Sequence, residues 1–350
     1  MRPKGACPPA RDLRAGLALI GLWLSAGAAV AADGGPTGAD GAGTPTVAQD
    51  RFRPQPLAKD SYGESFTFLA DLDDGTYVWT QFSVTNIGPG SNHGICRASV
   101  VSPDGRLWKA DKRVQPGDDE DGWRYDGGSH VLWIGRCSIT EGSAPEIRAV
   151  FKEGSVTLRF AEPLRPIKVD GSEFRIGGYV YRVNVLQPHA RVKATLTLGK
   201  AAPRTVDGSG YADHAYTAAE PSKVARHWVR FRALRTTPTV LLGRQGFDGS
   251  VGPAFRWTGQ GVSYFREFTL ERTGKDSSTN WSVRLGEPDK GTLKTFRFLN
   301  RRSFIQDLGF LGKMVKPFVG SPVTYTHRAV YERPGQPPVE GILEVSLEEG

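Results

Sequence analysis

The chain has 350 residues, of which 39% are apolar, 10% aromatic and 23% charged, and its formal net charge is +8. This composition is typical of a globular protein and excludes a disordered chain, a coiled coil and a polytopic membrane protein. With three cysteines, the chain is not a disulfide-dense mini-protein either. At about 150 residues per domain, the length favours two domains.

Residues 1–31 have the pattern of a secretory signal peptide. Basic residues come first, an apolar run covers residues 15–24, and Ala29-Val30-Ala31 forms a cleavage site. A short membrane anchor is the alternative interpretation. Cleavage would remove a net charge of +3 and leave +5. We therefore predict that the protein is exported, to the periplasm or the medium.

Residues 32–59 are rich in Gly, Pro, Ala and Thr and have no periodicity, which predicts a disordered linker. We assign residues 60–200 to an N-terminal domain and residues 201–350 to a C-terminal domain. The boundary is placed near the glycine-containing stretch Gly199–Ser209.

Apolar and polar residues alternate in many segments from Glu64 onward. The clearest runs are residues 155–160, 191–198, 229–233 and 281–285. A period of two gives each strand one buried and one solvated face, as in antiparallel sheets. Turn dipeptides such as Asp74-Gly75 separate the runs. The sequence therefore predicts an all-β fold of sandwiches or barrels.

One amphipathic helix is predicted near the C-terminus. Ser303 and Gln306 form a capping box, and Gly320 can end the helix. The apolar face would consist of Phe304, Leu308, Leu311, Val315 and Phe318.

Export changes the interpretation of the cysteines. Cys7 would leave with the signal peptide, so the mature chain would keep Cys96 and Cys137. Two cysteines in an oxidising compartment are candidates for a disulfide. Closing a loop of about 40 residues would contribute roughly 4 kcal/mol in the chain-entropy model. Two buried free thiols are the alternative, since the sequence does not give their separation.

The familiar catalytic signatures are absent from the sequence. It contains no G-x-S-x-G, H-E-x-x-H or C-x-x-C, and its six histidines lack metal-ligand spacing. We expect no metal and no cofactor. The densest basic cluster, Arg226 to Arg235, fits the solvated face of a strand. It also suggests transient contact with an anionic membrane surface. Nucleic acid is not expected for an exported protein of this charge, and the oligomeric state is left open.

The segment Gly210–Tyr216 brings an acid, an imidazole and two phenols close together. In a strand, Tyr211 and Asp213 would share one face, and His214 and Tyr216 the other. An Asp facing an apolar cavity would have a raised pKa and could donate a proton. In the alternative, structural interpretation, Asp213 caps a turn or bonds to a neighbouring strand.

Gly210-Tyr211-Ala212-Asp213-His214 resembles the G-Y-x-D-H core of the hydroxyneurosporene synthase (carotenoid hydratase) and yeast survival-factor-like family. Residues 75–86 and 101–105 are similar to early strands of that family. The resemblance covers most of residues 64–348. It implies two lipocalin-like antiparallel β-barrels packed together, with a hydrophobic ligand within or between them.

The resemblance also implies a role for the acid. Asp213 matches the acid that protonates the polyene in the hydratases, and His214 matches its neighbour. The chain departs from the family where Ala215-Tyr216-Thr217 replaces Asn-Trp-Gly. This departure weakens the argument for hydration chemistry.

Three functional hypotheses follow. The first is an exported protein that binds a hydrophobic small molecule, such as a lipid or an isoprenoid. Its ligand-binding residues would be Trp79, Phe82, Tyr216, Trp228 and Arg230. The second is a hydratase, isomerase or cyclase acting on an apolar olefin, with Asp213, His214 and Tyr211 as catalytic residues and Asp213 as proton donor. The third is an exported accessory protein without an active pocket.

Overall fold

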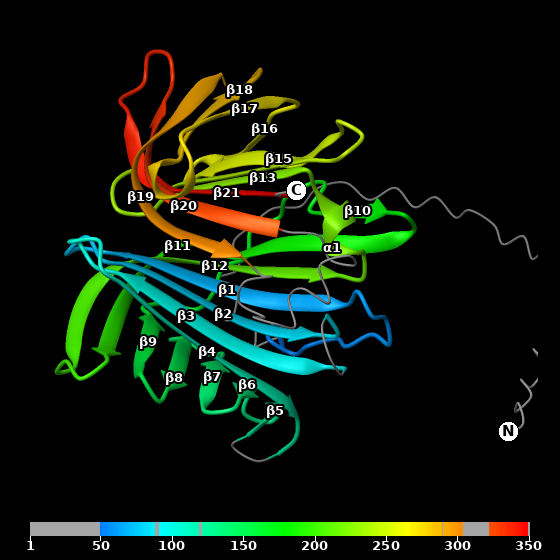
Figure 1. Cartoon of the computed structure of the whole chain (residues 1–350), viewed down its shortest axis with the longest axis vertical. Helices are drawn as coiled ribbons and strands as arrows, with labels where there is room; N and C mark the ends of the chain where they lie inside the picture. Colours follow the sequence, from blue (N-terminus) through cyan, green and yellow to red (C-terminus); the bar gives the residue numbers. More distant parts are fainter. Residues whose placement is uncertain (1–49, 88–90, 119–120, 289, 304–321, 349–350) are drawn as a thin grey trace, which may run out of the picture. The chain divides into compact units, whose positions relative to one another are not determined.

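The computed structural model describes residues 50–87, 91–118, 121–288, 290–303 and 322–348. They form an all-β structure in which two large sheets pack together (Figure 1). The predicted signal peptide and residues 304–318 of the predicted helix lie outside the described residues. Ser303, the predicted helix cap, is the last residue of a strand.

The first sheet contains twelve strands in the order β10-β11-β12-β1-β2-β3-β4-β5-β6-β7-β8-β9. An additional ladder between β9 and β11 joins the sheet to itself, and only β4 and β5 pair in parallel. The strands are β1 (Gly63–Leu72), β2 (Tyr77–Thr85), β3 (His93–Val101), β4 (Leu107–Pro116), β5 (Gly122–Asp126), β6 (Val131–Ile134), β7 (Cys137–Thr140), β8 (Glu146–Phe151), β9 (Gly154–Phe160), β10 (Glu173–Ile176), β11 (Tyr179–Leu198) and β12 (Arg204–Thr217).

The second sheet is a half-barrel of nine strands in the order β16-β15-β14-β13-β21-β20-β19-β18-β17. The strands are β13 (His227–Ala233), β14 (Thr239–Gln245), β15 (Val251–Thr258), β16 (Gly261–Tyr264), β17 (Phe268–Thr273), β18 (Asn280–Leu285), β19 (Gly291–Ser303), β20 (Pro322–Glu332) and β21 (Val339–Glu348). The remaining elements are a short helix α1 (Pro221–Val224) and a 3₁₀ turn η1 (Asp276–Ser278).

The chain passes from the first sheet to the second between Thr217 and His227. Strand β12, which lies beyond the predicted boundary near residue 200, belongs to the first sheet. Gly208 and Gly210 in this strand allow close packing against its neighbours. A Cβ atom at Gly208 would lie 2.7 Å from the Cα of Leu72, and one at Gly210 would lie 2.5 Å from Cγ1 of Val192.

Strand alternation produces three apolar clusters. Phe66 and Phe68 of β1 lie on the inner face of the first sheet, and Val229 and Phe231 of β13 lie on the inner face of the half-barrel. Residues of the opposite faces, such as Leu69, form a third cluster that joins the two sheets. The inner faces therefore hold each sheet together, while the outer faces meet each other.

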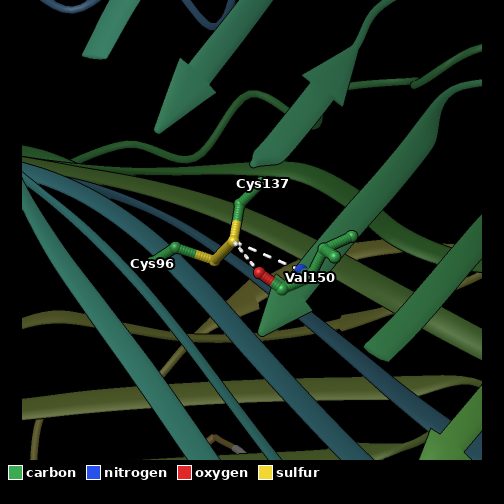
Figure 2. Close-up of a disulfide and its surroundings, with 3 residues drawn as sticks. All are labelled: Cys96, Cys137 and Val150. Carbon is green, nitrogen blue, oxygen red and sulfur yellow. Dashed lines mark hydrogen bonds between the residues drawn. A yellow bond between two sulfur atoms is a disulfide. The ribbon is translucent and has the colours of Figure 1, made fainter. Parts of the chain in front are cut away.

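Cys96 on β3 and Cys137 on β7 form the predicted disulfide (Figure 2). Their Cα atoms are 6.5 Å apart, and both side chains are fully buried in the core of the first sheet. The backbone N–H of Val150 contacts Cys137 Sγ at 3.4 Å. A buried bridge is consistent with folding in an oxidising, exported location.

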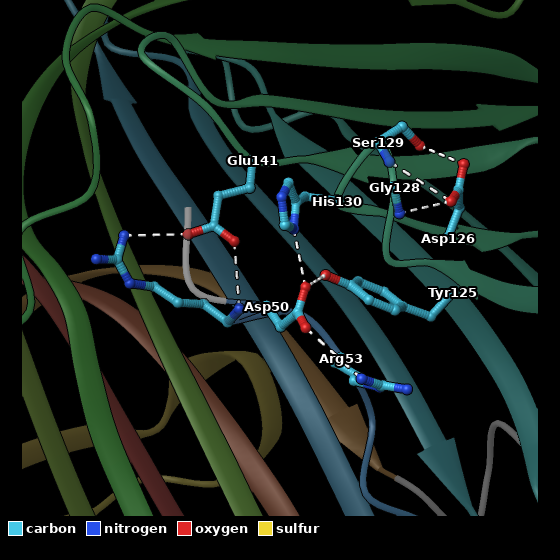
Figure 3. Close-up of polar contacts among 9 residues, drawn as sticks. Asp50, Arg53, Tyr125, Asp126, Gly128, Ser129, His130 and Glu141 are labelled. Atoms are coloured by element: carbon cyan, nitrogen blue, oxygen red, sulfur yellow. Dashed lines mark hydrogen bonds and ion pairs between the residues drawn. The ribbon is translucent and has the colours of Figure 1, made fainter. Parts of the chain in front are cut away.

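The residues just before β1 are anchored to the first sheet. The ring of Phe52 is fully buried and packs 5.4 Å from Phe66, although residues up to 59 were assigned to the linker. Figure 3 shows Asp50 accepting a hydrogen bond from Tyr125 Oη at 2.7 Å and contacting His130 Nδ1 at 2.8 Å. These bonds hold the pKa of Asp50 below its usual value.

A buried ion pair links the two sheets. Both terminal nitrogens of Arg328 on β20 donate to the carboxylate of Asp71 on β1, each at 2.7 Å. Arg328 also donates to the backbone oxygen of Gly75 at 3.1 Å. Bidentate geometry of this kind makes burial of two charges tolerable.

Replacing Arg328 with Met should lower the free energy of unfolding by about 3–5 kcal/mol, because Asp71 would remain buried without its partner. Urea unfolding at neutral pH measures the change. Arg284→Met is the matched control, because Arg284 pairs with Glu271 at the surface and both side chains are more than half exposed. The control should lose less than about 1 kcal/mol. Equal losses in the two variants would contradict a role for the buried pair.

Candidate functional site

A cavity of about 390 Å³ lies between the two sheets. The first sheet contributes residues from β1–β4, β11 and β12, and the second from β13 and β19–β21. Its charged lining residues are Arg97, Lys109, Asp111, Asp213, Arg230, Arg232, Arg301, Arg302 and Glu344. Six of these are cations and three are carboxylic acids, so the cavity has an excess of positive charge.

Arg232 is at the centre of the charged cluster. It is 2% exposed, and its Nη1 donates a short hydrogen bond to Glu344. Its Nη2 lies 3.4 Å from the carboxylate of Asp213. Arg302 donates to the second oxygen of Glu344. Glu344 is therefore held by two arginines, whereas Asp213 has one longer contact.

The two carboxylic acids differ in pKa. Burial alone would raise the pKa of Glu344, but Arg302 and Arg232 outweigh it and lower the value to about 2. Burial also raises the pKa of Asp213, and here the opposing effects of Arg232 and Arg230 do not cancel it. The site thus combines a firmly ionised carboxylate with a second acid that holds its proton more tightly than usual.

Aromatic rings stack against guanidinium groups in the cavity. Arg302 lies 4.2 Å from the centre of the Trp79 ring, a contact between the two sheets. Arg230 lies 4.6 Å from the Trp228 ring, which in turn packs 5.5 Å from Tyr181. Such stacking fixes the planes of the guanidinium groups.

The structure separates the predicted site residues into two groups. Asp213, Trp79 and Arg230 line the cavity. Tyr211 and Trp228 belong to the apolar cluster that joins the sheets, and Tyr211 shares the strand face of Asp213, as its spacing predicts.

The other three predicted residues point away from the cavity. Phe82 belongs to the core of the first sheet. His214 stacks 4.6 Å from Phe66, and its Nε2 lies 2.7 Å from Glu64 Oε1. Tyr216 packs against Tyr62 at 5.9 Å. His214 therefore takes part in a structural hydrogen-bond network rather than lying beside Asp213.

Sequence reasoning missed Arg232, Glu344 and Arg302. The alternation along β13 placed Arg230 and Arg232 on one face, which was interpreted as solvated, but Arg232 is buried. Glu344 and Arg302 lie far along the chain, and the strand order β13-β21-β20-β19 brings them near Arg232. The signal that could have found Glu344 is a single acid within the apolar segment Ile342–Val345.

Among the described residues, no group of three or more His, Cys, Asp or Glu side chains is arranged to hold a metal ion. No helix of the described part is long and apolar enough to cross a membrane.

No protein-family model matches the chain, and no curated protein matches its sequence. Solved structures do match its fold. A protein assigned provisionally as AttH, from Nitrosomonas europaea, is 14% identical with a TM-score of 0.59, over 87% of this chain and 99% of that one. Kievitone hydratase from Nectria haematococca is 12% identical with a TM-score of 0.55, over 87% and 94%.

CghA solved with Sch210972 is a third neighbour, 12% identical with a TM-score of 0.54, over 83% of this chain and 90% of that one. At such identities the likeness establishes the fold alone. The sequence resemblance implied two packed β-barrels; the structure shows two large packed sheets, one of which is a half-barrel.

Substitution of the two cavity acids should have different effects on stability. Glu344→Gln should lower the free energy of unfolding by about 3–5 kcal/mol near neutral pH, because Arg232 and Arg302 would lose their shared carboxylate. Asp213→Asn should leave stability unchanged or raise it, because it removes an acid whose charged form is disfavoured by burial.

The contributions of the two acids to the stability of the fold change with pH in opposite directions. Glu344 stabilises the fold above its unfolded pKa, and this contribution is lost as the pH falls toward 2. The raised pKa of Asp213 favours the fold at low pH, and that contribution is lost as the pH rises. Urea unfolding near pH 7 and near pH 3 should therefore show the Glu344→Gln deficit shrinking on acidification, while Asp213→Asn becomes less favourable relative to wild type. If acidification changed the stability difference from wild type in the same direction for both variants, the opposite pKa shifts of the two acids would be contradicted.

Proposed function

We propose that the protein is exported and binds a small organic molecule in the cavity between its two sheets. The observation that carries this proposal is the cavity itself, into which both sheets present polar side chains and the first sheet also presents the aromatic side chains of Trp79 and Tyr181. Ligand sites in proteins typically combine an apolar lining with a few convergent polar groups. The signal-like N-terminus and the disulfide support export.

The lining favours an amphipathic ligand over a wholly apolar lipid or isoprenoid. Trp79, Tyr181 and Val183 offer an apolar surface, whereas arginines and hydroxyl groups occupy much of the remaining wall. A hydrocarbon placed there would desolvate these polar groups without replacing their hydrogen bonds. The hydrophobic part of the ligand would then contact the aromatic side chains.

Filling the cavity should prevent binding. Ala215 lines the cavity, so Ala215→Phe should abolish the fluorescence increase of the neutral probe N-phenyl-1-naphthylamine. It should also remove any small molecule found by mass spectrometry in an organic extract of the purified protein. Ala201→Phe, at an exposed turn, is the matched control and should behave as wild type. Absence of probe binding and of an extractable molecule in the wild-type protein would contradict the proposal.

A second candidate function is acid-catalysed hydration of a carbon–carbon double bond. The raised pKa of Asp213 inside the cavity favours it, and one of the structural neighbours is a hydratase by name. Asp213 would donate its proton to one carbon, water would add to the other, and the proton released by that water would return to Asp213.

Charge makes this the second candidate rather than the first. Protonation of an apolar olefin produces a carbocation, and Arg230 and Arg232 beside Asp213 would repel it.

Asp213→Asn should abolish hydration while leaving probe binding intact. The molecule extracted from the protein would be incubated with wild type and variant in ¹⁸O-labelled water, and label incorporation followed by mass spectrometry. Asn cannot donate a proton to the double bond, so incorporation should stop. An unchanged rate in the variant would exclude Asp213 as the acid.

A further inference from the structure

The charges closest to Glu344 do not balance. Arg230, Arg232 and Arg302 each act on the Glu344 carboxylate, and Asp213 is the other acid of the cluster. Three guanidinium groups thus face two carboxylic acids. The net charge is +1 when Asp213 is ionised and +2 when it is protonated. Because Arg232, Glu344 and Asp213 are buried, the attraction of such an excess for an anion is screened less than it would be at the surface.

Arg230 is the guanidinium group that lacks a carboxylate partner within the described residues. Arg232 pairs with Glu344 and Asp213, and Arg302 pairs with Glu344. Arg230 donates a long hydrogen bond, 3.3 Å, from Nη1 to Ser346 Oγ, and it also interacts with the Tyr181 hydroxyl. Its guanidinium group is half-buried and lines the cavity. Hydrogen-bond donors of Arg230 therefore remain for a molecule in the cavity.

The surroundings hold Arg230 in place for such a contact. Its stacking on Trp228 fixes the plane of the guanidinium group, and Tyr181 from the first sheet supports that ring. Ser346 and Thr324 place two further hydroxyl groups in the cavity wall, with their oxygens 2.8 Å apart. A planar guanidinium beside hydroxyl donors is the arrangement that recognises carboxylates and similar anions.

We infer that the ligand of this cavity is an organic anion, and that its carboxylate or sulfonate group binds Arg230 while its apolar part lies against Trp79 and Tyr181. This inference rests on the proposed function, because it names the chemical class of the molecule bound at that same site. It assigns ligand binding to Arg230 and not to Arg232, because Arg232 is already paired with Glu344 and Asp213.

Two fluorescent probes with the same ring system provide the test. 1-Anilinonaphthalene-8-sulfonate carries a negative charge, and N-phenyl-1-naphthylamine is its neutral counterpart. Wild-type protein should bind the sulfonate about ten- to a hundredfold more tightly, as expected for one charge-assisted contact. Dodecanoate should displace either probe from the cavity, whereas dodecanol should compete at least about tenfold more weakly.

Arg230→Gln should lower the affinity for the sulfonate by at least about tenfold and leave the affinity for the neutral probe unchanged. Arg284→Gln is the matched control, because it removes the same charge from an exposed ion pair. It should bind both probes as wild type does. Arg230 is preferred to Arg302 for this test because replacing Arg302 would also disturb Glu344.

The outcomes distinguish the two proposals. Binding of neither probe to the wild type would overturn the proposed function and this inference with it. Equal affinities for both probes and equal competition by dodecanoate and dodecanol would overturn the inference alone. If Arg230→Gln does not fold, as judged by its urea unfolding curve, the wild-type comparison of the two probes decides the question.

Discussion

The arrangement of the two sheets depends on where Arg232 finds its partners. A guanidinium group that is 2% exposed requires carboxylates, and it finds Glu344 in its own sheet and Asp213 in the other. Burying such a charge costs several kcal/mol unless the pairing is good. The cluster therefore restricts the second sheet to positions that bring β13 and β21 against β12. Arg328 and Asp71 impose a similar constraint from β20 to β1.

The same constraint acts on the cavity between the sheets, which lies beside the apolar cluster that joins them. The half-barrel presents Arg230, Glu344, Thr324 and Ser346 to the first sheet at this cavity. Buried polar groups of this kind need partners in fixed positions. The same residues that set the sheet-to-sheet geometry therefore also form the walls of the candidate site.

The sequence predicted what depends on local pattern. Period-two alternation predicted the all-β fold, the pairing of Cys96 with Cys137 followed from compartment and number, and strand geometry placed Asp213 and His214 on opposite faces. The sequence could not predict which strands pair, because register is a long-range property. For that reason Glu344 and Arg302 were missed, and the domain boundary was placed near Gly199–Ser209, where the structure has paired strands from Arg204 onward. Phe52 was missed because one buried ring gives no periodic signal.

The separation of Asp213 from His214 has a chemical consequence. With His214 bonded to Glu64, its imidazole does not take the proton from Asp213 or activate a water molecule beside it. The neighbours of Asp213 are instead guanidinium groups, which stabilise negative charge and oppose positive charge. A carbocation beside Asp213 would therefore be opposed by the same guanidinium groups that favour retention of an organic anion. The electrostatic field of the cavity thus supports the inferred class of ligand and disfavours protonation of an apolar olefin at this position.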